Sequence, residues 1–134
     1  MRHFTPAEAN QALEVVRPLT DELVRRRRAL VEVQEGLQRV RAKVAGNGGG
    51  FDQQAVGEAR ARADAALQGL EHALAALDEI GVQVKDLDRG LIDFPAAHPA
   101  DGSIVLLCWH LGEDEVLFWH SLEEGFAGRK PLPF

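Results

Sequence analysis

The side chains best suited to chemistry lie in the C-terminal third of this 134-residue chain, where Cys108, His110, Glu113 and His120 follow one another. Thiols, imidazoles and carboxylates bind zinc and other divalent transition metals, and zinc needs three or four of them converging on one point. Asp93 adds a second carboxylate nearby in the sequence. We therefore hypothesise a site for zinc or another divalent transition metal that is formed by Cys108, His120, Glu113 and Asp93.

Convergence of these side chains depends on the register of a β-hairpin predicted around them. Residues two apart on a strand share a face, so Cys108 and His110 would lie together. A two-residue turn would pair Cys108 with Leu117 and would put His120 on the opposite face. A three-residue turn would pair Cys108 with Phe118, and the cysteine and both histidines would then converge. The sequence leaves both registers open.

The same side chains also have a purely structural interpretation. A single cysteine inside the apolar run 104–109 is typical of a small buried side chain, and Trp109 and Trp119 are typical of a core. The chain contains neither Cys-x-x-Cys nor His-Glu-x-x-His, the spacings that mark many metal sites. Catalysis is disfavoured, because burial in a strand would raise the pKa of the thiol instead of activating it.

Arg129 follows a glycine-containing segment, residues 125–128, that lacks the strand and helix of a phosphate-binding loop. We therefore expect this arginine to bind a carboxylate of the chain itself. The two candidates are Glu113 and Asp93.

A long N-terminal helix is predicted ahead of this region. Thr5, Pro6 and Glu8 form a capping box with proline at the first helical position. Apolar residues then recur at spacings of three and four for five heptads, interrupted only at Arg26, which predicts a helix that packs along most of its length. They are Ala9, Ala12, Val16, Leu19, Leu23, Leu30, Val33, Leu37, Val40 and Val44. Pro18 removes a backbone hydrogen bond, so a kink or break is expected there.

A second helix is predicted between Asp52, its N-cap, and Gly81, its terminator. The glycine-rich residues 45–50 predict a flexible turn, so residues 1–80 would form an antiparallel helical hairpin. The apolar stripe of the second helix is wide and needs more cover than one helix gives. We expect a homodimer with a helical-bundle interface, and the alternative is a monomer whose sheet covers both helices.

After the second helix the apolar period changes to that of strands. Short β-prone runs predict a three- or four-stranded antiparallel sheet, and they are residues 82–84, 91–94, 103–110 and 116–120. Pro95 is expected to end the second run, Gly112 and Glu113 are expected to form a type II′ turn, and the tail from Gly125 is expected to be irregular. The prediction is thus an α+β fold in one domain, 1–134, with the helical hairpin in 1–80 and the sheet and tail in 81–134.

The net charge of −6 averages two unlike parts of the chain. The first 45 residues hold nine basic and six acidic side chains, and the remainder holds six basic and fifteen acidic ones. The two parts would therefore attract each other within one chain or between chains.

Composition disfavours nucleic acid and membranes as partners. The basic residues 25–28 point around a helix, have no aromatic residue among them and are flanked by acidic residues, so we expect a solvated face or ion pairing with the acidic part of the chain. No apolar run approaches the roughly 18 residues that cross a bilayer. The first residues lack the pattern of a signal peptide, and one cysteine fits a reducing compartment, so we expect a cytoplasmic protein.

Five blocks of the chain together resemble a known family. They are residues 4–10 (FTPAEAN), 81–95 (GVQVKDLDRGLIDFP), 107–113 (LCWHLGE), 118–120 (FWH) and 125–129 (GFAGR). This combination is similar to the bacterial domain-of-unknown-function family 2203, and the resemblance extends over nearly the whole chain. It implies no particular activity.

Two function classes follow from these observations. The first is a non-enzymatic structural or interaction protein that dimerises through its helices and presents its acidic sheet region to an unidentified protein partner. The second is a small protein that binds a transition metal in the C-terminal β-hairpin.

Overall fold

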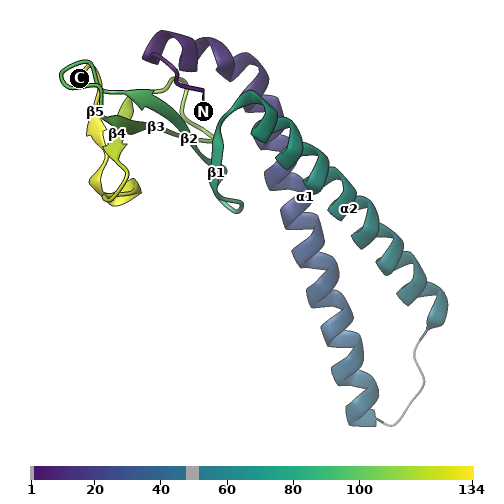
Figure 1. Ribbon diagram of the computed structural model, residues 1–134. Helices are drawn as coiled ribbons and strands as arrows, with labels where there is room; N and C mark the ends of the chain where they lie inside the picture. The colour runs from purple at the N-terminus through teal and green to yellow at the C-terminus, as the bar shows by residue number, and fades with distance from the viewer. Residues whose placement is uncertain (1, 48–51) are drawn as a thin grey trace.

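The computed structural model describes residues 2–47 and 52–134 and consists of a long helical hairpin joined to a small antiparallel sheet (Figure 1). The helices are α1 (Pro6–Asn47) and α2 (Gln53–Ile80). The strands are β1 (Gln83–Asp86), β2 (Leu91–Ala97), β3 (Ile104–His110), β4 (Phe118–Ser121) and β5 (Lys130–Pro131), and a 3-10 turn, η1 (Phe126–Gly128), precedes the last. The strands are paired in the order β1-β2-β3-β4-β5. The predicted α+β fold with a helical hairpin is confirmed.

Local capping determines where both helices begin and where α2 ends. At the start of α1, the Thr5 N–H donates to Glu8 Oε1 at 2.9 Å and the Glu8 N–H donates to Thr5 Oγ1 at 3.1 Å. The Asp52 carboxylate accepts from two N–H groups of the first turn of α2, and Gly81 ends that helix with φ +100°. These caps are the ones that the sequence predicts. The predicted turn is shorter than expected, since α1 continues through Asn47, and the rest of it lies outside the described residues.

Pro18 lies inside α1, and the helix changes direction in its N-terminal part, shown in purple in Figure 1. Proline cannot supply the backbone hydrogen bond that would hold the preceding turn straight. The predicted kink is therefore present without a break in the helix.

The large buried side chains between the two helices lie near the sheet, and farther along only the small Ala59 and Ala66 of α2 are buried in the described part of the hairpin. Leu23 of α1 is fully buried with Leu70 and Ala73 of α2, whereas no described side chain of α1 beyond Val24 is buried. Figure 1 shows the helices diverging toward the far end of the hairpin. The prediction that α1 packs along most of its length is therefore wrong within one chain. The reason is that the apolar side chains that α2 presents there are small, namely Ala55, Val56 and Ala59, and they fill little of the space between the helices.

One face of the sheet packs on the helices and forms the main core. Phe94 and Trp109 are fully buried there, and Phe94 meets Phe4 edge-on at 5.3 Å between ring centroids. Other members are Ala9, Leu13, Val16, Leu77, Val82, Ile92, Ala96, Val105, Leu107 and Val116. Within residues 2–47 and 52–134, neither α1 nor α2 lies against the opposite face of the sheet (Figure 1).

Two details of the sheet differ from the prediction. β2 does not end at Pro95 but continues to Ala97, because β1 pairs only with Leu91–Asp93 and no strand on that side needs the missing proline N–H. The Phe4 N–H instead donates to the Pro95 carbonyl oxygen at 2.7 Å. The sheet also has a fifth strand in the tail. A search for β-prone residues does not find it, because the strand is short and contains Pro131.

Three of the four basic residues 25–28 form ion pairs and the fourth, Arg28, is exposed, so both expected arrangements are found. Arg25 binds Asp21 at 2.8 Å and Glu22 at 2.7 Å, and Arg26 also binds Glu22. Arg27 reaches Asp88 beyond β1 at 3.4 Å, so the basic helix does contact the acidic remainder of the chain. Across the described residues, neither helix has an apolar stretch long enough to pass through a bilayer.

Candidate metal centre

The register of β3 and β4 decides which side chains meet on the face away from the helices. Cys108 pairs with Phe118, and Leu106 pairs with His120. On the other side, Cys108 pairs with Asp93 of β2. This is the second of the two registers that the sequence left open, and it puts Asp93, Cys108 and His120 on one face.

The connection between β3 and β4 differs from the predicted tight turn. It spans residues 111–117, and β4 begins at Phe118 instead of 116. Gly112 has φ +106°, so glycine is needed at the bend, but the two-residue type II′ turn is wrong. The physical reason is Val116, which is buried in the main core and draws the chain out of the strand.

Asp93, Cys108 and His120 form a buried cluster, which we call the three-residue site. One potential ligand atom from each residue lies within 4.8 Å of the other two. The exposed fractions of the residues are 2% for Asp93, 0% for Cys108 and 3% for His120. Three metal-binding side chains are therefore gathered in a place that water hardly reaches.

The hydrogen bonds of His120 fix which ring nitrogen is free. Nδ1 lies 2.8 Å from the Ser121 carbonyl oxygen, and because a carbonyl only accepts, Nδ1 carries a hydrogen. In the neutral ring the Nε2 lone pair then faces Asp93 Oδ1 at 3.3 Å. Histidines that bind metals commonly donate the other N–H to a backbone carbonyl or a carboxylate, as His120 does.

Burial shifts both acidic groups of the site toward their protonated forms. It raises the pKa of the Asp93 carboxyl against the opposing influence of His120. Burial, reinforced by the neighbouring Asp93 charge, raises the pKa of the Cys108 thiol to about 12. Without a cation the thiol is therefore no nucleophile at neutral pH, whereas a bound metal ion would deprotonate it outright.

The spacing of the three-residue site suits a tetrahedral ion. Bond lengths of zinc to nitrogen, oxygen and sulfur place neighbouring ligand atoms about 3.3–3.6 Å apart. The 3.3 Å between His120 Nε2 and Asp93 Oδ1 already meets that requirement. Cys108 Sγ lies within 4.8 Å of a ligand atom of each of the other two residues, so it needs to move inward by no more than about 1.5 Å.

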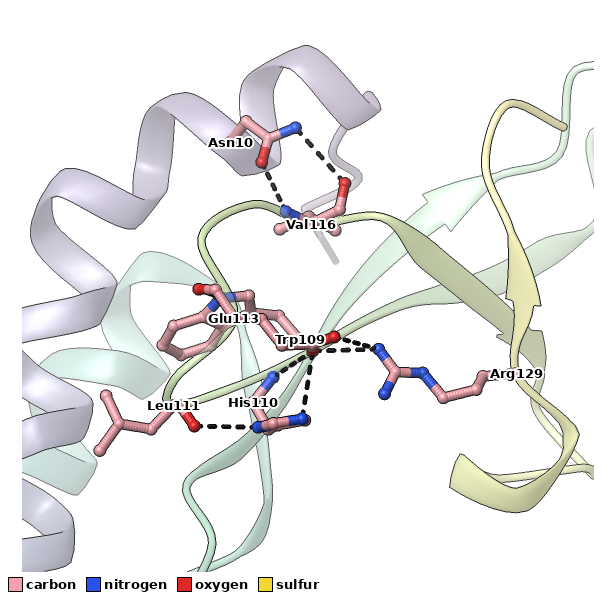
Figure 2. Close-up of polar contacts among 7 residues, drawn as sticks. All are labelled: Asn10, Trp109, His110, Leu111, Glu113, Val116 and Arg129. Carbon is pink, nitrogen blue, oxygen red and sulfur yellow. Dashed lines mark hydrogen bonds and ion pairs between the residues drawn. The ribbon is translucent and has the colours of Figure 1, made fainter.

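Glu113, the fourth ligand predicted from the sequence, has other partners (Figure 2). Both of its carboxylate oxygens accept from Arg129, at 2.9 and 3.0 Å, and Oε1 also accepts from the His110 N–H at 3.0 Å. The expected pairing of Arg129 with one of two carboxylates is thus found with Glu113. His110, which the Phe118 register would have allowed into the site, instead donates from Nδ1 to the Leu111 carbonyl oxygen at 2.9 Å, and its Nε2 lies 3.7 Å from Glu113 Oε1.

The sequence analysis missed the residues that hold the 111–117 connection in place. Asn10 of α1 accepts from the Val116 N–H at 2.6 Å and donates to its carbonyl oxygen at 3.5 Å, and Trp109 Nε1 donates to the Glu113 carbonyl oxygen at 2.8 Å (Figure 2). The Arg129 guanidinium also lies over the Phe118 ring, 3.9 Å from its centroid. Two signals pointed to Asn10, namely its place in the block 4–10 that resembles a known family and its polarity beside the buried positions of an amphipathic helix.

Comparison with known proteins gives one match. A family model described as "Uncharacterized conserved protein (DUF2203)" matches residues 2–132. No curated protein and no solved structure matches the chain. The matched range includes all three residues of the buried site and the Glu113–Arg129 pair.

Proposed function

The chain belongs to the family of uncharacterized conserved proteins DUF2203, and within that family we propose that it binds a divalent transition metal through Asp93, Cys108 and His120. Zinc is the ion that fits this donor set best, because it accepts thiolate, imidazole and carboxylate ligands in tetrahedral geometry. Three protein ligands leave the fourth position of such an ion to water.

One observation carries the proposal. His120 Nε2 and Asp93 Oδ1 are two acceptor atoms that face each other at 3.3 Å in a buried place. Two lone pairs at that distance need a positive charge between them, either a proton or a metal ion. The presence of Cys108 Sγ as a third donor beside this pair favours the metal ion.

The proposal is tested by metal analysis of the full-length protein purified without chelator, followed by zinc and cobalt titration of protein stripped with EDTA. We expect one equivalent of metal per chain and a thiolate-to-cobalt charge-transfer band. Zinc at about 100 times its dissociation constant should stabilise the fold by about 2.7 kcal/mol. Cys108→Ser and His120→Asn should each weaken binding by about 100-fold.

His110→Asn is the matched control. His110 also contacts the carbonyl oxygen of the following residue through Nδ1, but it lies outside the three-residue site. Its replacement should change metal affinity by less than about twofold. Absence of bound metal together with no stabilisation by added zinc would refute the proposal, and so would an equal loss of affinity in both histidine variants.

A thiolate ligand must stay reduced, which supports placing the protein in the cytoplasm. The other function class, a dimeric interaction module, depends on the helical hairpin and is independent of this site.

A further inference from the structure

The far end of the helical hairpin contains an apolar groove that no residue of the described ranges 2–47 and 52–134 fills. It consists of two adjoining hollows of about 430 and 280 Å³ between α1 and α2. Its apolar lining, which we call the distal groove, is formed by Val33, Leu37, Val40, Val44, Ala55, Val56 and Ala59. Ala59 is the one described residue of this set that is buried.

The α1 side of the distal groove continues the heptad pattern of the packed part of the hairpin. Leu37 occupies the same heptad position as Leu23, and Val40 occupies the other apolar position of the heptad. Leu23, near the sheet, is fully buried, whereas Leu37 is half-buried and Val40 is 37% exposed. Gly36 lies beside them, and a Cβ there would meet only the end of the Arg39 side chain. A glycine inside a helix costs about 1 kcal/mol relative to alanine, and room for the close approach of another helix would account for it.

The charges beside the groove are arranged by sign along α1. Glu32 and Glu35 lie on the N-terminal side of Leu37, and the basic residues on its C-terminal side are Arg39, Arg41 and Lys43. All five are exposed, and none forms an ion pair with another side chain of the described chain. The segment therefore has an acidic half and a basic half around an apolar centre.

We propose that the distal groove is the interface of a homodimer, in which α1 of a second copy packs antiparallel to α1 and is centred near Leu37. An antiparallel arrangement brings the acidic half of each segment against the basic half of the other, so that Glu32 of one copy, which lines the groove, approaches Lys43 of its partner. A parallel arrangement would instead oppose like charges. The pairing is the same in both directions, as a two-fold symmetric interface requires.

The apolar positions have the same symmetry. In an antiparallel pair centred near Leu37, Val33 of each copy lies opposite the region of Val40 in the other, and Leu30 lies opposite Val44. The groove of each hairpin is thus filled by the apolar heptad residues on α1 of the other copy, and the product is a four-helix bundle. This self-complementarity selects a second copy as the occupant over an unrelated protein, and the charges fix the orientation more than the affinity.

The oligomeric state of the full-length protein tests the proposal. Light scattering at micromolar concentration should give twice the 14.7 kDa mass of one chain. Val40→Glu puts a charge at the centre of the interface and should raise the dimer dissociation constant at least about tenfold. Leu67→Glu is the matched control, because Leu67 is similarly exposed, at 42%, but does not line the groove, and it should change the constant by less than about twofold.

A charge exchange tests the orientation without touching the apolar residues. Glu32→Lys and Lys43→Glu should each weaken the dimer, and the double variant should restore it because each new lysine then meets a new glutamate. Circular dichroism confirms that each variant keeps its helices. A monomeric wild-type protein, equal effects of Val40→Glu and Leu67→Glu, or a double variant weaker than both single ones would overturn the proposal. None of these results depends on metal, so they stand apart from the test of the three-residue site.

Discussion

His110 and His120 are two histidines in similar local positions with different surroundings. Each has Nδ1 within hydrogen-bonding distance of the carbonyl oxygen of the next residue, at 2.9 and 2.8 Å, and each has a carboxylate near Nε2. The carboxylate beside His110 belongs to Glu113 and is neutralised by Arg129, whereas no described arginine or lysine forms an ion pair with Asp93 beside His120. A histidine and a carboxylate therefore make a plausible cation site only where no arginine already supplies the charge.

The largest effect that would sharpen this comparison is expected from Arg129→Met. The change leaves the Glu113 carboxylate largely buried without its cation and should lower the free energy of unfolding by about 3 kcal/mol, measured by urea denaturation. Arg89→Met is the control, because Arg89 and Arg129 both lie over the Phe126 ring, at 5.1 and 4.7 Å from its centroid, but Arg89 is exposed. It should cost about 0.5 kcal/mol or less. A loss below about 1 kcal/mol in Arg129→Met would show that Glu113 needs no cation.

A smaller loss is expected from Asn10→Ala, which loosens the surroundings of Glu113 but not those of Asp93. It leaves the Val116 N–H without its acceptor and should cost about 2 kcal/mol. If the pair of His110 with Glu113 is independent of the pair of His120 with Asp93, this variant should bind zinc as tightly as the wild type. A competition assay with a chromophoric chelator measures the zinc affinity. A loss of zinc affinity would show that the 111–117 connection also supports the three-residue site.

Replacing each carboxylate by its amide should change the stability of the metal-free protein in opposite directions. Asp93→Asn removes an acid whose ionised form is disfavoured by burial, and it should stabilise the EDTA-treated protein by up to about 1 kcal/mol. Glu113→Gln weakens the pair with Arg129 and should destabilise it by about 1 kcal/mol. In excess zinc, Asp93→Asn should instead unfold at a lower temperature than the wild type, because it has lost a metal ligand. Destabilisation by both changes in EDTA would break the comparison.

The smallest effect concerns the thiol beside His120. Because the pKa of Cys108 is raised to about 12, almost no thiolate exists at neutral pH, and the side chain is also fully buried. Iodoacetamide should therefore label the native metal-free protein at least about tenfold more slowly than the urea-unfolded chain. Mass spectrometry measures the labelling rates, and equal rates for the native and the unfolded chain would mean that the three-residue site is open to solvent.

Local sequence signals predicted the helices well because a cap depends on neighbours only. The capping box at Thr5 and the termination at Gly81 involve residues no more than four positions apart. The position of Phe118 opposite Cys108 depends instead on Val116 being buried and bound by Asn10, 106 residues away. The sequence of the β3–β4 hairpin alone does not show that Val116 contacts Asn10, so two registers of this hairpin remained open.

The candidate site was predictable in its residue types but not in its membership. Asp93, Cys108 and His120 were singled out because they carry the right donor atoms, and the register brings them together. Glu113 carries an equally suitable carboxylate, but Arg129, sixteen residues later, lies close enough to bind both of its oxygens. Whether Arg129 binds Glu113 or Asp93 depends on how the tail pairs with β4. The sequence gives little indication of that pairing, because the strand that makes it is short and contains Pro131.

The contact between Asn10 and Val116 has a consequence for the order in which the chain folds. During synthesis the two helices can meet as soon as α2 has emerged, but α1 cannot complete its contact with the sheet until residue 116 is available. The Phe4 N–H likewise waits for Pro95. Contacts between such distant parts of a chain form slowly, so we expect the hairpin to appear first and the sheet to close onto the first turns of α1 last. A ribosome stalled before residue 116 would then carry a helical hairpin whose sheet-facing surface is still exposed.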